Sequence, residues 1–400
     1  MTRRYLLPLA VTAALTTTFA VPAAEAGQHR GAESWRADLS MVDADDSGVT
    51  SNGHTVRLDR SAAIPASTRT ALRTGYLHLT PHRLATPANT IAATATSQIP
   101  DGTELAVDVR GALGGDQWTE WVEARPDTPA ALPTTVDTVQ VRLALTSTGP
   151  QSPEISDLTL TPSTTRTSTR ESTGHSYRVY ATREGLVGGT TANGHVIVDR
   201  DHFAALPSRR GLSPKATGAY SVQVCADNDR CEWAPVWDVG PWNTKDDYWN
   251  PPATREMWQD LPQGTPEAQA AHQDGYHGGK DQFGRKVTNP AGIDLADGTF
   301  WDGLELTANA WVTVTYLWTV EGPAGFVRTA GDPLDVRNGA TTTAPRAGLA
   351  ANHAQVRVEC QLTGEPVTGS QGTSDIWYRI ATDKYVAKAY VSDVEGATAC

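Results

Sequence analysis

The sequence predicts a mainly β protein with three folded units: a β-sandwich, a central β-barrel and a small C-terminal barrel. Short stretches of alternating apolar and polar residues recur along the chain, a pattern typical of half-buried strands. Residues that favour turns separate these stretches. A Thr/Ser-rich linker at 161–174 and a Gly/Pro-rich break at 321–325 divide the chain, so the expected units are 34–160, 175–320 and 326–400.

The first residues predict an export signal over 1–26. Arg3 and Arg4 precede an apolar stretch, and Ala24-Glu25-Ala26 has the small-x-small pattern of a cleavage site. The arginine pair leaves both the general secretory and the twin-arginine route open. No later segment has the length of a membrane span. We therefore expect a secreted protein.

The net charge limits the classes of partner that the protein can bind, and the cysteines bear on the redox state of its compartment. The net charge is -12 and the pI is about 5.3, which argues against nucleic acid as a partner. An exported protein is expected to oxidise its cysteines. Spacing alone allows three pairings, but Cys225 with Cys231 and Cys360 with Cys400 each lie inside one expected unit.

The first unit predicts an antiparallel sandwich. Thr103–Arg110 and Val139–Leu145 alternate, and the apolar residues of 155–160 suggest a closing strand. Trp118 and Trp121 fit either a sugar-binding platform or packing at the sandwich edge. In general pattern this unit resembles the jelly-roll accessory domains of secreted actinobacterial wall proteins.

The central unit holds eight of the twelve tryptophans, an enrichment that suits a glycan groove because aromatic rings stack on sugars. Trp311–Trp318 is predicted as a core strand. Trp242, Trp249 and Trp258 lie in polar, Pro-rich surroundings and are the better candidates for a cleft.

The central unit contains four short motifs, and they occur in the same order as the motifs of a known family. They are Thr191-Ala-Asn-Gly194, Leu206-Pro207, Asp238-Val-Gly-Pro241 and Ile293-Asp-Leu295. Together they resemble the rare lipoprotein A proteins and, more distantly, expansins. The resemblance covers about 175–243 and 290–318 and implies a six-stranded double-psi β-barrel. The family has Asp-Arg-Gly-Pro at the third motif, so Val239 replaces its arginine.

The resemblance implies site residues. Asp238 corresponds to the proposed general acid of a lytic transglycosylase, His202 most nearly to the family's histidine, and Asp294 to the aspartate of its last motif. One carboxyl can protonate the leaving oxygen and then accept the proton of the sugar's C6 hydroxyl, closing a 1,6-anhydro ring. The residues expected to bind the glycan are Asn193, Trp237, Trp242, Trp249 and Tyr180.

Each of the three proposed catalytic residues also fits a purely structural role. Asp238 also fits a carboxylate that binds the backbone N–H groups of its turn. Asp294 fits a cap of the turn that follows it, and His202 fits a hydrogen-bonding surface residue. Burial of Asp238 away from any groove would remove the catalytic role.

Residues 243–291 are an insertion relative to the compact family barrel, and they predict a lid or groove wall with helices at Arg255–Leu261 and Glu267–His272. The spacing of its acidic and histidine residues fits no recognised ligand pattern, so no metal and no cofactor are expected. The residues concerned are Asp246, Asp247, His272, His277 and Asp281.

The last unit contains alternating strands over Gln355–Cys360, Asp375–Ile380 and Tyr385–Val391. Its opening, Leu334-Asp-Val-Arg-Asn-Gly339, resembles that of bacterial SH3 domains. The resemblance implies a small barrel that anchors the protein on cell-wall peptides or glycan. A spacer is the alternative.

The sequence thus predicts a monomeric, cell-wall-associated protein that cleaves or remodels the glycan strands of peptidoglycan. The competing hypothesis is a non-catalytic, expansin-like protein that binds peptidoglycan or another wall polysaccharide. An extracellular scaffold that leaves the cleft unused is a third hypothesis.

Overall fold

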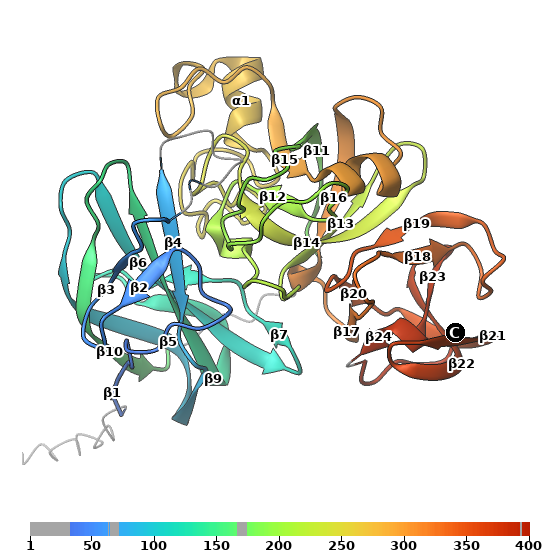
Figure 1. The fold of residues 1–400 in the computed structure, drawn as a ribbon, viewed down its shortest axis with the longest axis horizontal. Helices are drawn as coiled ribbons and strands as arrows, with labels where there is room; N and C mark the ends of the chain where they lie inside the picture. Colours follow the sequence, from blue (N-terminus) through green and yellow to red (C-terminus); the bar gives the residue numbers. More distant parts are fainter. Residues whose placement is uncertain (1–32, 63, 65–71, 166–173, 393) are drawn as a thin grey trace, which may run out of the picture. The chain divides into compact units, whose positions relative to one another are not determined.

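The computed structural model describes residues 33–62, 64, 72–165, 174–392 and 394–400. The predicted export signal and most of the predicted linker lie outside these residues. The protein is mainly β and contains a closed six-stranded barrel and a half-barrel sheet, as the sequence predicts in outline (Figure 1). No described helix is both long enough and apolar enough to cross a membrane.

Ten strands of the first part of the chain form one sheet system. They are β1 (Trp35–Arg36), β2 (Val49–Ser51), β3 (Val56–Leu58), β4 (Arg73–His78), β5 (His82–Gln98), β6 (Thr103–Gly114), β7 (Gln117–Trp118), β8 (Val122–Glu123), β9 (Ala130–Ser147) and β10 (Glu154–Ser163). Strand β10 continues through the first residues of the predicted linker.

The long strand β9 organises this sheet system. Its first half pairs with β5, and its second half lies between β4 and β6. The predicted alternation holds on β9, because Val139, Val141, Leu143 and Leu145 all enter one hydrophobic core.

The central barrel consists of β11 (Ser176–Arg183), β12 (Ala204–Leu206), β13 (Ser221–Cys225), β14 (Cys231–Val239), β15 (Ala291–Leu295) and β16 (Ala310–Tyr316). Around the barrel the order is β12-β15-β11-β16-β13-β14, and β14 pairs again with β12 to close it. Two neighbouring pairs, β11 with β15 and β12 with β14, are parallel, and the other four are antiparallel. Alternate residues such as Val222, Val224, Val312 and Val314 fill the interior.

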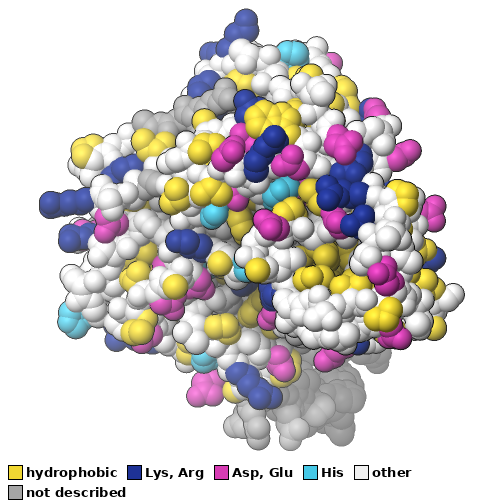
Figure 2. Space-filling view, turned by 45° about the vertical axis from the view of Figure 1, so that its right-hand side comes forward, with side chains coloured by type: hydrophobic (Ala, Val, Ile, Leu, Met, Phe, Trp, Pro, Cys, Tyr) yellow, Lys and Arg dark blue, Asp and Glu magenta, His cyan; other side chains and the backbone are white. Residues whose placement is uncertain are grey.

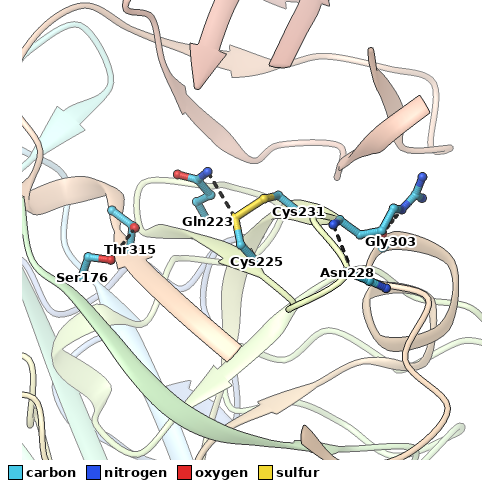
Figure 3. The surroundings of a disulfide bond; sticks show 8 residues. Ser176, Gln223, Cys225, Asn228, Cys231, Gly303 and Thr315 are labelled. Atoms are coloured by element: carbon cyan, nitrogen blue, oxygen red, sulfur yellow. Dashed lines mark hydrogen bonds between the residues drawn. A yellow bond between two sulfur atoms is a disulfide. The ribbon is translucent and has the colours of Figure 1, made fainter. Parts of the chain in front are cut away.

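A disulfide closes the hairpin between β13 and β14. Cys225 and Cys231 face each other across the two strands and are bonded, as predicted. Figure 3 shows Asn228 in the turn beyond the bond. Its side-chain amide donates a hydrogen bond to the carbonyl of Leu304. The hairpin end is thereby fixed to the segment that follows β15.

The insertion after β14 has little regular structure. Helix α1 (Glu267–Asp274) confirms the second predicted helix and ends at Gly275 in a left-handed conformation (φ 69°). The first predicted helix, Arg255–Leu261, is wrong. Trp258 has φ 59°, which interrupts a right-handed helix, and Arg255 turns inward to pair with Asp246. Single helical turns elsewhere are Arg209–Gly211, Tyr276–Gly278, Thr299–Gly303, Leu317–Thr319 and Lys388–Tyr390.

The last eight strands are β17 (Ala324–Val327), β18 (Leu334–Arg337), β19 (Arg346–Ala350), β20 (Gln355–Arg357), β21 (Cys360–Gly369), β22 (Gly372–Ala381), β23 (Lys384–Ala387) and β24 (Val391–Ser392). Strands β17, β20 and β24 form a separate small sheet, whereas β19 pairs in parallel with β14. The C-terminal sheet therefore continues directly from the barrel. The second predicted disulfide, Cys360–Cys400, is also present.

A buried charged network joins the first sheet system to the barrel. Asp108 on β6 accepts hydrogen bonds from Arg142 on β9 at 2.6 Å and from Arg209, which follows β12, at 3.2 Å. The Arg142 side chain is completely buried. Beside this network the Arg110 guanidinium lies over the rings of Trp118 and Trp121, so this tryptophan pair packs at the junction.

Candidate functional site

The register of the barrel strands places the two predicted acidic residues, Asp238 and Asp294, at the same level on the two strands that flank β12. Ala205 on β12 pairs with Asp238 on β14 and with Asp294 on β15, and Asp294 in turn pairs with Thr182 on β11. Because neighbouring strands lie about 4.8 Å apart, the backbones of Asp238 and Asp294 are about 10 Å apart. Opposed residues point to the same face of a sheet, so these side chains share one surface of the barrel.

Asp238 lies at the end of β14 and is completely buried. Its Oδ1 accepts hydrogen bonds from the backbone N–H groups of Ala192 at 2.7 Å and Val239 at 2.8 Å. The carboxyl therefore ties its own turn to the loop that follows β11. This geometry is that of the backbone-binding alternative.

Glu184 completes the acidic cluster and was not singled out by the sequence. It is buried immediately after β11, and its carboxyl lies close enough to those of Asp238 and Asp294 to interact with their charges. Burial, and then the charges of Asp238 and Asp294, raise the pKa of Glu184 well above its ordinary value. The resemblance includes no motif at this position, and only its place at a strand end marks it in the sequence.

Asp294 is nearly buried and accepts a hydrogen bond from the Thr182 hydroxyl. It does not cap the turn after β15, which begins at Gly298 without a side-chain cap. The register thus brings Asp294 into the acidic cluster of Glu184 and Asp238.

The loop over the cluster, residues 186–198, is held by Asn193. This side chain is buried, accepts from Thr191 Oγ1 and His195 N, and donates to the Ser213 carbonyl. Its hydrogen-bonding groups are therefore engaged within the loop and its support. The outer surface of the loop is apolar and exposed at Leu186, Val187, Val196 and Val198.

The two nearby histidines have carboxylate partners of their own. His202 Nδ1 lies 2.9 Å from Oε1 of the buried Glu232. Burial opposes the charge on His202, but Glu232 outweighs it and raises the pKa of the imidazole. His195, which the sequence did not single out, pairs with Asp201 at 2.6 Å and lies 4.8 Å from the Trp237 ring. Its only signal is its position directly after the Ala-Asn-Gly motif.

The predicted aromatic residues do not gather along one groove. Trp237 is largely buried and donates to the Thr217 carbonyl. Trp249 is completely buried, stacks on Tyr316 and donates to Glu120, so it packs the interior. Trp242 is half-buried and donates to Asn289 in the insertion, whereas Tyr180 lies half-buried on the outside of β11.

The face of the barrel beside Asp238 is covered by the first sheet system. Val239 packs in an apolar cluster with residues of β4, β6 and β9, namely Tyr76, Ala106 and Ala144. A cavity of about 250 Å³ remains next to this contact, and Ala192, Val239 and Lys245 help to line it. The residue in place of the family's arginine is therefore part of an interface.

A larger cavity, of about 490 Å³, lies on the C-terminal sheet. Its lining includes Asp335, Arg337, Arg346, Trp377 and Tyr390. It combines aromatic rings with charges of both signs, a composition suited to a polar ligand. Acidic and basic side chains are likewise interspersed over the face drawn in Figure 2.

The acidic residues of the insertion are engaged by arginines. Asp246 pairs with Arg255, Asp247 pairs with Arg210, and Asp281 pairs with Arg285. His272 and His277 are exposed. Three carboxylates held by cations are poor candidates for a shared metal ion.

A family model described as a domain of unknown function (DUF8814) matches residues 175–315, the barrel with its insertion. No curated protein matches the chain.

Proposed function

We propose that this chain is an exported protein that binds the polysaccharide of the cell wall, peptidoglycan foremost, without cleaving it. The observation that carries this proposal is the state of Asp238. It is completely buried and bound to two backbone N–H groups beneath residues 186–198. A general acid must reach the leaving oxygen of the sugar, and a carboxyl in this position does not.

The strand order supports the resemblance on which the wall assignment rests. A closed six-stranded barrel with two parallel pairs is compatible with the double-psi barrel of rare lipoprotein A proteins and expansins. Val239 stands where the rare lipoprotein A proteins have an arginine, and it packs against the first sheet system. This packing supports the proposal that no substrate groove is open beside Asp238.

The cavity on the C-terminal sheet is the proposed contact with the wall. It lies on the unit whose sequence resembles bacterial SH3 domains. The partly exposed Tyr390 ring suits a sugar face, and Asp335 with Arg346 suits the charged groups of wall peptides. Anchoring through this unit is part of the proposal.

Lytic cleavage of the glycan strand is the second candidate, and Glu184 favours it. A carboxyl whose pKa is raised by burial and by neighbouring carboxylates retains the proton that a general acid donates. This reaction requires residues 186–198 to leave the cluster.

Purified peptidoglycan tests the two candidates. We expect the wild-type chain to sediment with peptidoglycan and to release no fragments detectable by mass spectrometry. Anhydro-muropeptides released by the wild type but not by Asp238→Asn would replace the proposal with the lytic one. Failure to sediment would reject wall binding.

A matched pair of variants tests the contact surface. Arg346 lines the C-terminal cavity and Arg178 lies on the barrel, and each is about half exposed and paired with an aspartate. We expect Arg346→Ala to weaken sedimentation roughly fivefold or more. Arg178→Ala should sediment like the wild type, and equal behaviour of the two variants would move the contact elsewhere.

A further inference from the structure

Two aspartates and a histidine of the first sheet system converge on one point. Asp45 and Asp46 lie in the segment before β2, and His78 is the last residue of β4. Their candidate ligand atoms all lie within 4.8 Å of one another. Backbone hydrogen bonds in both directions between Ser47 and Tyr76 fix the segment to β4. The three side chains are therefore brought together by the fold.

The imidazole of His78 is the observation that points to a ligand. Its side chain is only 2% exposed, and among the described residues neither ring nitrogen has a hydrogen-bond partner. Nδ1 lies 3.7 Å from Asp46 Oδ1, too far for a hydrogen bond but suitable for two atoms that share an ion. A buried polar group without a partner is costly, so this position requires an explanation.

Charged groups also surround His78. Burial lowers the pKa of His78, the neighbouring Asp46 opposes this shift, and the charges of Arg142 and Arg110 contribute to the lowering. The two arginines have acceptors of their own, Asp108 for Arg142 and Gln140 for Arg110.

The carboxylates supply the charge that a cation would neutralise. Asp46 is held in place because it accepts hydrogen bonds from the backbone N–H groups of His78 at 2.6 Å and Asp43 at 2.7 Å. Asp43 and Asp46 are the acidic neighbours of Asp45 in this segment. Three carboxyls within four residues thus crowd one side of the cluster.

We propose that Asp45, Asp46 and His78 form a binding site for a divalent transition-metal ion, with Zn²⁺ the best match. An imidazole with two carboxylates is a nitrogen and oxygen donor set that zinc accepts, whereas calcium and magnesium prefer oxygen donors alone. The sequence predicted no metal, but the residues weighed there belong to the insertion.

The site has a structural consequence. The bound ion fastens residues 43–47 to the end of β4. Ser47 in this segment donates to the carbonyl of Ala192, the same residue whose N–H binds Asp238. Zinc therefore stabilises the contact between the first sheet system and the barrel, and it does so independently of glycan binding.

Calorimetric titration of ZnCl₂ into the full exported chain, freed of metal by a chelator, tests the proposal at neutral pH. We expect one equivalent to bind and the midpoint of thermal unfolding to rise with zinc. Asp45→Asn and His78→Gln should each weaken binding about tenfold or more. Asp101→Asn changes an exposed carboxylate between β5 and β6 and should leave the affinity unchanged.

Three results would overturn the proposal. One is the absence of zinc binding in the wild type. Another is wild-type affinity in Asp45→Asn, which changes a half-exposed side chain and is the variant expected to fold in any case. The third is binding of CaCl₂ in a parallel titration without binding of ZnCl₂.

Discussion

The Glu184 carboxyl is buried near Asp238 and Asp294, and this environment favours its protonated form. Neighbouring carboxylates in the interior repel one another, so one of them tends to keep its proton. The raised pKa of Glu184 means that the folded protein keeps a proton which the unfolded chain gives up. This residue therefore makes folding sensitive to pH.

Glu184→Gln should remove that sensitivity. Between the ordinary glutamate value of 4.5 and the raised pKa of Glu184, the folded state binds more protons than the unfolded state. The free energy of unfolding of the wild type therefore falls as pH rises through this interval. Urea unfolding should show little difference near pH 4 and a growing advantage of the variant toward pH 8.

Glu305→Gln is the matched control, because the Glu305 side chain is 59% exposed. It should follow the wild type over the same pH range. A Glu184→Gln profile parallel to that of the wild type would contradict the raised pKa.

At the scale of single residues, the sequence predicted that Asp238 lies in a turn after a strand, but not which groups surround its carboxyl. The Gly-Pro turn after a strand marks Asp238 by local pattern, whereas the approach of Glu184 depends on how β11 and β14 are arranged in the closed barrel. Strand register is set by packing across the sheet and has no local signal. The same applies to Trp249. Its neighbours in the sequence are polar and suggested a cleft position, but its ring is packed on Tyr316.

The strands are the elements that local pattern predicted best. The alternating stretches at 103–110 and 139–145 fall on β6 and β9. The stretch predicted at 311–318 falls on β16 as far as Tyr316, where the strand ends and a single helical turn begins. Side-chain period identifies such strands because one face of each must be buried. The residues of Arg255–Leu261 are compatible with the helix that was predicted there. The helix does not form because Arg255 pairs with Asp246 and Trp258 has a positive φ.

The two disulfides should differ in what they contribute to stability. Cys225 and Cys231 are 6 residues apart, and Cys360 and Cys400 are 40 apart. A longer closed loop loses more entropy in the unfolded chain, which predicts about 2 kcal/mol for the first bond and about 4 kcal/mol for the second. Denaturant unfolding of the two double-alanine variants measures both values.

A larger loss on removing Cys225–Cys231 would contradict the loop-length argument. It would indicate that the hairpin contributes through its native contacts, such as the hydrogen bond from Asn228 to Leu304.

For the whole molecule, the buried network around Asp108 is a polar link between the first sheet system and the barrel. Its members come from β6, β9 and the turn after β12, positions far apart in the chain. The sequence predicted strand-rich stretches but had no means of showing that residues from different stretches share buried charges. Long-range ion pairs leave no periodic signal.

Asp108→Asn should destabilise the protein by roughly 3–5 kcal/mol, because it leaves Arg142 and Arg209 buried without their shared carboxylate. Calorimetry should show a lower and broader transition as the two parts lose their connection. Asp227→Asn is the control, since its exposed pair with Arg178 should contribute nothing measurable. An unchanged transition in Asp108→Asn would mean that the apolar contacts alone join the parts.

The parallel pairing of β14 with β19 also bears on where the chain can be divided. A fusion carrying only residues 324–400 would present the edge of β19 to solvent, and one ending before β19 would expose that edge of β14. Open strand edges recruit other chains and aggregate. A fragment cut at this boundary is therefore expected to be more prone to self-association than the intact chain.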